Sequence, residues 1–212
     1  MDCDEARARI EEIQRIVERT TLWPLLPGAA AVLGGMLVLA GCGVSYGMLR
    51  SFDFAALLTM SPNAQMAFCC MWFGIGAIGV IVQVAFTAHA AKKQGLSPTT
   101  RSARVATFSM TPSLLVAMVL TIRFLIPVAP RTEEVQYIVP VWMMLYGTGV
   151  YSAGLFSVRP PRILGLTFLG TGVIALLFFP GYGVVSAAAS FGLLHIVFGI
   201  YILRKRRRGQ SR

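Results

Sequence analysis

Two histidines, His89 and His195, are the residues of this sequence best suited to hold a cofactor within an apolar segment. His195 lies about 8 residues from the polar end of the last such segment, and His89 about 2 residues from that of the second. At about 1.5 Å rise per residue, their depths differ by roughly 9 Å. Two axial ligands of one haem must lie level. We therefore expect no shared haem and predict no bound cofactor.

His195 shares one helix face with small residues, because Ala188, Gly192 and Gly199 stand at helical spacing from it. Small faces are where membrane helices pack closely, and ionisable groups within spans usually point into the bundle. Polar side chains lie at matching depth in the other apolar segments: Gln83, Thr111, Ser113, Tyr151, Ser152 and Thr171. We predict that His195 bonds at least one of them. The cluster would serve either as structural hydrogen bonds between helices or as a ligand or proton-relay site.

A second candidate cluster consists of Cys42, Cys69 and Cys70, which fall at similar depth in the first two apolar segments. Methionines gather toward the same side, and thiols and thioethers are soft ligands that suit Cu(I). A disulfide would need two Cα atoms within about 7 Å. Because cysteine is also an ordinary packing residue, we predict packing and assign no metal site, with a disulfide and a copper site as alternatives.

Enzyme motifs are missing or stand in the wrong context. No Asp or Glu falls within an apolar segment, and no HExxH pair occurs. Residues 43–47 (GVSYG) spell GxSxG, but they lie within the first apolar segment rather than at a turn between a strand and a helix. Residues 74–79 spell GxGxxG, the dinucleotide fingerprint, but within an apolar helix rather than between a strand and a helix. We interpret these glycines as points of close helix approach. The sequence therefore predicts no catalytic residue and no enzyme.

Six apolar segments position these residues. Of the 212 residues, 56% are hydrophobic and only 13% are charged, too few charges for a soluble domain. Each segment can cross about 30 Å of hydrocarbon as a helix, which satisfies its own backbone polar groups. The segments run over 22–48, 66–91, 105–128, 137–157, 163–179 and 183–203. The fold class we predict is all-α, an integral membrane bundle of six transmembrane helices with an N-terminal cytoplasmic amphipathic helix.

Two connections carry features of their own. The loop 49–65 contains Phe54 and Leu57 among other apolar residues, which predicts a short helix lying on the outer membrane interface. Arg123 stands near the outer end of the third segment, before Glu134 in the next loop. We expect its side chain to reach toward that loop, with an anion site in an outward cavity as the alternative.

Basic residues set the orientation. Of the 19 Lys and Arg residues, 16 fall on one side of a six-span arrangement, which predicts that both termini are cytoplasmic. We assign residues 1–20 to a cytoplasmic amphipathic helix, 21–203 to the transmembrane domain and 204–212 to a basic cytoplasmic tail. The basic face should attract anionic lipids. Because no aromatic or groove-reading element accompanies it, we expect no nucleic-acid partner.

Three stretches carry a resemblance to known proteins. They are residues 18–21 (ERTT) before the Gly/Ala-rich first segment, residues 145–160 (LYGTGV, then GLFSVRP), and residues 194–199 (LHIVFG) before the basic tail. In this order they resemble a poorly characterised group of small bacterial six-span proteins. The resemblance implies a multi-pass protein of the bacterial inner membrane and transfers no functional residue.

These features favour a non-enzymatic membrane protein, an accessory, scaffold or regulatory subunit that binds a protein partner or forms a homo-oligomer. The first alternative is a small transporter or channel with a mid-depth polar site, which requires a cavity lined by Gln83 and His195. The second is a copper- or haem-binding redox protein. A scaffold should instead have a packed interior and an apolar face left for lipid or for a partner.

Overall fold

The computed structural model describes residues 28–93, 101–125, 132–155 and 159–210, with a few positions between 5 and 13. Within them, every element is a helix. The long helices are α2 (Gly28–Leu49), α3 (Pro62–Lys93), α4 (Arg101–Leu125), α5 (Ile138–Leu155), α6 (Arg159–Phe178) and α8 (His195–Gln210). Short 3₁₀ helices, η2 (Phe54–Thr59) and η3 (Thr132–Tyr137), join α2 to α3 and α4 to α5. The prediction of an all-α bundle is confirmed.

Six helices of the described chain are long and apolar enough to cross a membrane, as predicted. The sixth, Gly183–Lys205, is a continuous rod made of α7 (Gly183–Ala187), the π-helix η4 (Ala188–Leu194) and the first part of α8. Most of the predicted amphipathic helix over 1–20 lies outside the described residues. Within it, Arg9 pairs with Glu5 one helical turn earlier, at 2.8 Å between Nη2 and Oε1.

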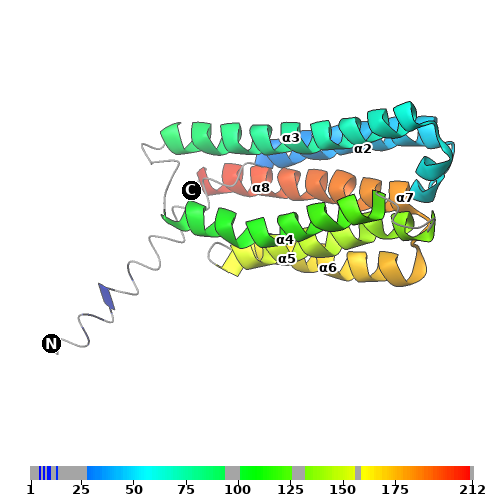
Figure 1. The fold of residues 1–212 in the computed structure, drawn as a ribbon. Helices are drawn as coiled ribbons and strands as arrows, with labels where there is room; N and C mark the ends of the chain where they lie inside the picture. Colours follow the sequence, from blue (N-terminus) through cyan, green and yellow to red (C-terminus); the bar gives the residue numbers. More distant parts are fainter. Residues whose placement is uncertain are drawn as a thin grey trace.

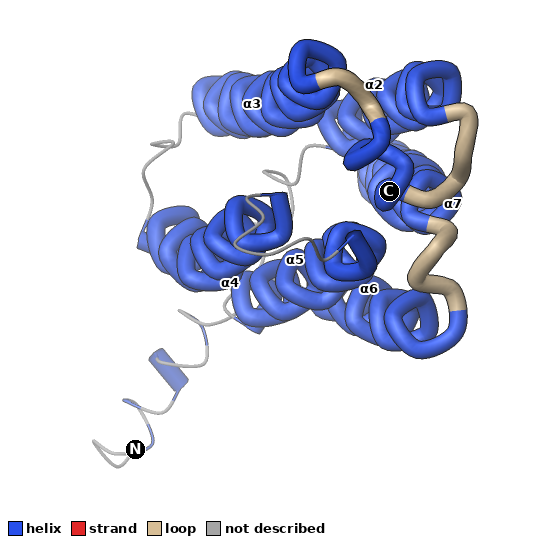
Figure 2. Tube along the Cα trace, turned by 45° about the vertical axis from the view of Figure 1, so that its right-hand side comes forward, coloured by secondary structure: helices blue, strands red, loops and turns tan. Residues whose placement is uncertain are grey.

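The long helices run side by side in two groups (Figure 1). In one group α5 packs between α4 and α6, and in the other α2 packs against α3 and against η4 and α8. Figure 1 shows α8 between the α2–α3 pair and the α4–α6 group, and in Figure 2 α7 lies between α2 and α6. The polar side chains of the last rod can therefore meet residues of the α4–α6 group.

Glycines set the closest helix contacts. A Cβ at Gly199 would lie 2.5 Å from the backbone oxygen of Gly28, and one at Gly35 would lie 2.5 Å from that of Gly192. These pairs fall seven residues apart on both helices, which run antiparallel. The small face predicted around His195 is thus the face that α2 contacts, where backbones approach without side chains between them.

The glycines of the GxGxxG stretch do not take part in such contacts, which corrects the interpretation from sequence. A Cβ added at Gly74, Gly76 or Gly79 would meet nothing within 4 Å. The reason is that α3 contacts α2 through other side chains, such as Ile75, which covers Gly41. This part of α3 is left open.

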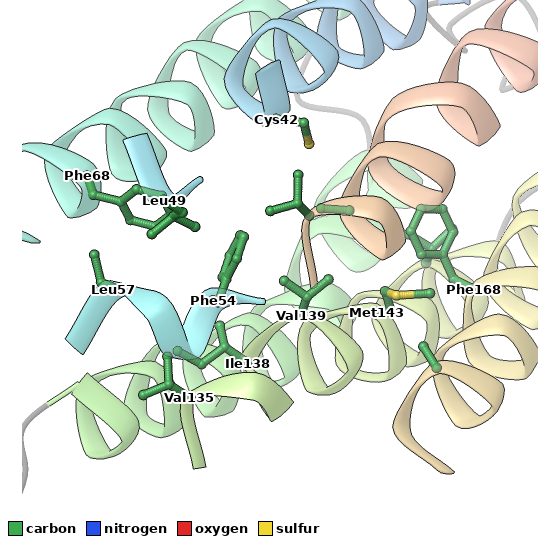
Figure 3. Close-up of a cluster of buried hydrophobic side chains, with 14 of the residues drawn as sticks. Cys42, Leu49, Phe54, Leu57, Phe68, Val135, Ile138, Val139, Met143 and Phe168 are labelled. Carbon is green, nitrogen blue, oxygen red and sulfur yellow. The ribbon is translucent and has the colours of Figure 1, made fainter. Parts of the chain in front are cut away.

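The two 3₁₀ helices close one end of the bundle (Figure 3). Phe54 of η2 is 6% exposed and packs edge to face on Phe68 of α3, while Val135 of η3 is fully buried. Asp53 caps η2 by accepting a hydrogen bond from the backbone N–H of Ala55 at 2.8 Å. The short helix predicted in this connection is therefore present, and two of its apolar side chains, Phe54 and Leu57, are buried against other helices of the chain.

Candidate functional site

His195 and Tyr146 form a polar pair between the two helix groups. The Tyr146 hydroxyl lies 2.8 Å from Nε2 of His195, and so joins α5 to the start of α8. His195 therefore points into the bundle, as predicted, but its side-chain partner is Tyr146 and none of the six polar residues proposed from depth.

Two phenylalanine rings, those of Phe168 and Phe191, contact both members of this hydrogen bond. Tyr146 contacts Phe168 of α6 at 4.9 Å and Phe191 of η4 at 5.3 Å between ring centroids. His195 contacts Phe168 at 5.3 Å and stacks on Phe191 at 6.2 Å with only 16° between planes. Phe168 is fully buried. The pair is thus half-buried among aromatic rings, and within a membrane little water would be present to replace a lost hydrogen bond.

The other imidazole nitrogen, Nδ1, is buried and forms no hydrogen bond of good geometry with a described residue. The backbone oxygens of Ser190 and Phe191, in the wide turn of the π-helix, interact with the ring. The Tyr146 hydroxyl donates to Nε2 in one imidazole tautomer and accepts from it in the other.

The polar residues proposed as partners of His195 are not brought together with it by any hydrogen bond among the described residues. Thr111 donates to the oxygen of Thr107, and Thr171 donates to that of Thr167 in its own helix. Gln83 is exposed on α3. Tyr151, Ser113 and Ser152 are half-buried and have no hydrogen bond to His195.

Counting depth from the predicted end at 157 missed Tyr146, whereas the described part of α5 reaches Leu155. Tyr146 is nine residues before that end, just as His195 is nine residues before Arg204. Phe168 is likewise nine residues after Arg159, where α6 begins. The equal spacing of Tyr146, His195 and Phe168 from their helix ends can be counted in the sequence, but only when each end is known to within two residues.

The three outer cysteines are free thiols in different surroundings. Cys42 is buried in the hydrophobic core, Cys69 is half-buried and Cys70 is exposed on α3. Among the described residues, no group of three His, Cys, Asp or Glu side chains converges as a metal site would require. Of the three, Cys42 is the one that packs in the hydrophobic core.

Arg123 reaches toward the following connection, and its Nη1 lies 3.2 Å from Oε2 of Glu134. The carboxylate occupies the position that an anion would need. This contact confirms the prediction that the side chain of Arg123 reaches toward the loop, rather than the alternative of an anion site.

Two tryptophans bind hydroxyl groups across neighbouring helices, which sequence analysis did not foresee. Trp72 of α3 donates from Nε1 to Ser45 Oγ of α2 at 3.0 Å, and Trp142 of α5 donates to Thr121 Oγ1 of α4 at 2.6 Å. Each bond joins the two helices connected by η2 or by η3. A hydrogen bond from a tryptophan indole to a hydroxyl group therefore links the two helices of each hairpin.

The Trp142 bond should contribute measurably to stability. We expect Trp142→Phe to lower the free energy of unfolding by about 1 kcal/mol, the usual value of a hydrogen bond between membrane helices. Thr121 keeps its own bond to the oxygen of Ala117, so no buried group is left unpaired. Unfolding in mixed micelles measures the change. The same substitution in a Thr121→Val background should have a smaller effect, and an equal effect would contradict the assignment.

An apolar groove of about 540 Å³ lies between α6 and the α7–η4 segment. Its lining consists of Met143, Thr167, Thr171, Ile174, Ala175, Phe179, Tyr182, Val185, Ser186, Ala189, Ser190 and Leu194. The hydroxyl groups of Thr167, Thr171 and Ser190 donate to carbonyl groups of their own helices. The lining contains neither Gln83 nor His195 and carries no acidic or basic side chain, so it lacks groups that would bind a charged substrate.

Comparisons of this chain with protein-family models, with curated proteins and with solved structures gave no match.

Proposed function

We propose that this chain is a non-enzymatic multi-pass protein of the bacterial inner membrane, an accessory, scaffold or regulatory subunit of a membrane assembly. Both termini are cytoplasmic in this proposal, and the basic residues there attract anionic lipids. A protein partner or a further copy of the chain binds between or against the membrane helices.

The observation that carries the proposal is the uneven packing of the six helices. In the apolar stretches of α3 and α4, only 6% and 11% of residues are buried, against 28% to 44% in the other four. Val80 and Ile81 of α3 are 62% and 65% exposed, and Val119 of α4 is 63% exposed. Two of six helices thus contribute little to the interior and present their side chains outward, where a partner can bind them.

The transporter alternative finds less support. It requires Gln83 and His195 to line one cavity, but Gln83 is exposed on α3 and His195 lies against aromatic rings beside Tyr146. The groove along α6 is apolar and includes neither residue. The redox alternative requires converging ligands, which the described residues do not supply.

Photo-crosslinking in native membranes tests the proposal. A photoreactive amino acid at Val80 of α3 or Val119 of α4 should give protein adducts, because these side chains face a partner. Leu166 of α6, which is 55% exposed, serves as the matched control and should react mainly with lipid. If none of the three positions gives a protein adduct, the scaffold proposal is wrong.

Topology is tested separately. A cysteine introduced within 131–136 of a chain without other cysteines should react with a membrane-impermeant reagent in intact cells, and one within 95–100 should not. The charge distribution is the reason, since 16 of 19 basic residues share the side of 95–100. Labelling in the reverse pattern would place both termini outside the cytoplasm.

A further inference from the structure

The side chain of Gln83 lies within the apolar stretch of α3, and the described fold leaves it without a partner. It is exposed, and its amide forms no hydrogen bond with any described residue. Lys92, the first charged residue after it, is nine positions away, or about 13 Å along a helix at 1.5 Å per residue. In the membrane proposed above, this amide would face hydrocarbon, where water cannot satisfy it.

Hydroxyl groups on the surrounding helices do not share this problem. Thr87 of α3 donates to the oxygen of Gln83, and Thr111, Thr148 and Thr167 likewise donate to the carbonyl group four residues earlier. Each is satisfied within its own helix. Gln83 differs because a carboxamide carries two donors as well as an acceptor, and this requires a partner outside the described fold.

The residues around Gln83 suit the approach of another helix. One face of α3, here called the Gln83 face, contains Gly76, Val80, Gln83, Thr87 and Ala90. These residues follow one another by alternating steps of four and three, the spacing of a helix–helix seam. A Cβ at Gly76 would meet nothing within 4 Å, so a partner backbone can come close at that point.

We propose that the Gln83 face joins two copies of this chain in a symmetric dimer. All copies insert with the same orientation, so two α3 helices related by a two-fold axis along the membrane normal run parallel and each residue meets its counterpart. A carboxamide both donates and accepts, so two Gln83 side chains satisfy one another. A basic or acidic counterpart would give no such self-complementarity. The inference rests on the proposed scaffold function and names its partner.

Disulfide trapping in native membranes tests the geometry without altering Gln83. In a chain lacking its native cysteines, Val80→Cys lies on the Gln83 face and Ile81→Cys lies about 100° around the helix. Both positions are comparably exposed, at 62% and 65%. Mild oxidation should yield cross-linked dimer from Val80→Cys and much less from Ile81→Cys. Equal yields, or none from Val80→Cys, would overturn the inference.

Association of the full chain in lipid vesicles tests the role of the amide. Energy transfer between labelled copies should report a dimer, and Gln83→Leu should weaken it roughly tenfold, the effect of one such hydrogen bond between membrane helices. The control is Ala85→Leu, on the opposite side of α3, which should associate like the native chain. A Gln83→Leu variant that associates as well as the native chain would overturn the inference. Adducts at Val80 with another protein, without a dimer, would also overturn the inference but leave the scaffold function standing.

Discussion

Replacing Gly165 with alanine should lower the free energy of unfolding by about 3 kcal/mol, toward the upper end of what overpacking costs. A Cβ at this position would lie 2.5 Å from the backbone nitrogen of Tyr151 and 2.7 Å from the backbone oxygen of Gly147. Backbone atoms cannot rotate away as side chains do. The helices α5 and α6 would have to separate along their most extensive contact, and the ring of Phe168 would lose its enclosure.

Gly170 provides the matched control on the same helix. A Cβ there would meet nothing within 4 Å, so Gly170→Ala should change the free energy of unfolding by no more than about 0.5 kcal/mol. Both variants can be unfolded in mixed micelles under the same conditions. Similar losses for the two substitutions would mean that helix geometry, rather than the contact between α5 and α6, makes glycine necessary.

The fold class and the number of long helices followed from the sequence, because composition and run length depend on residues counted locally. Lateral packing did not follow. Gly76 and Gly165 are both small residues in apolar helices, yet one faces open space and the other touches a neighbouring backbone. Small residues permit close approach on any face, but only the positions of the other helices decide which face is used.

The two short connecting helices illustrate a second limit. Phe54 and Leu57 suit an interfacial helix, and the sequence cannot distinguish side chains that face a membrane surface from side chains that are enclosed, as Val135 of η3 also is. They are buried because η2 and η3 meet each other at the same end of the bundle. The contact between η2 and η3 joins segments that are far apart in the sequence, so the residues within either segment do not predict it.

The candidate site was predicted in part. The inward direction of His195 followed from its small helix face, and that inference needed only the helical repeat. The identity of its partner required the relative heights of α5 and α8. An error of two residues in one helix end is about 3 Å at 1.5 Å per residue. That shift is enough to favour Tyr151 over Tyr146 when partners are chosen by depth alone.

Removing either member of the Tyr146–His195 pair should destabilise the chain by about 1–3 kcal/mol, the cost of leaving a buried polar group unpaired. In Tyr146→Phe, Nε2 of His195 loses its 2.8 Å partner among aromatic rings. In His195→Leu, the Tyr146 hydroxyl is left among apolar side chains and the contacts of the imidazole with Phe168 and Phe191 are lost as well. Unfolding in mixed micelles measures each loss.

The double variant separates this account from simple loss of packing. When both polar partners are absent, no unpaired group remains, so Tyr146→Phe combined with His195→Leu should cost less than the two single losses added, by about 0.5–3 kcal/mol.

Tyr151→Phe is the control, because Tyr151 was the partner expected from depth and has no hydrogen bond to His195. It should change stability by no more than about 0.5 kcal/mol. Additive losses in the double variant would show that the two residues act independently, and a large loss in Tyr151→Phe would favour the partner chosen by depth. The expected pattern would instead make the pair a structural link between α5 and α8, which leaves the exposed faces of α3 and α4 for binding partners.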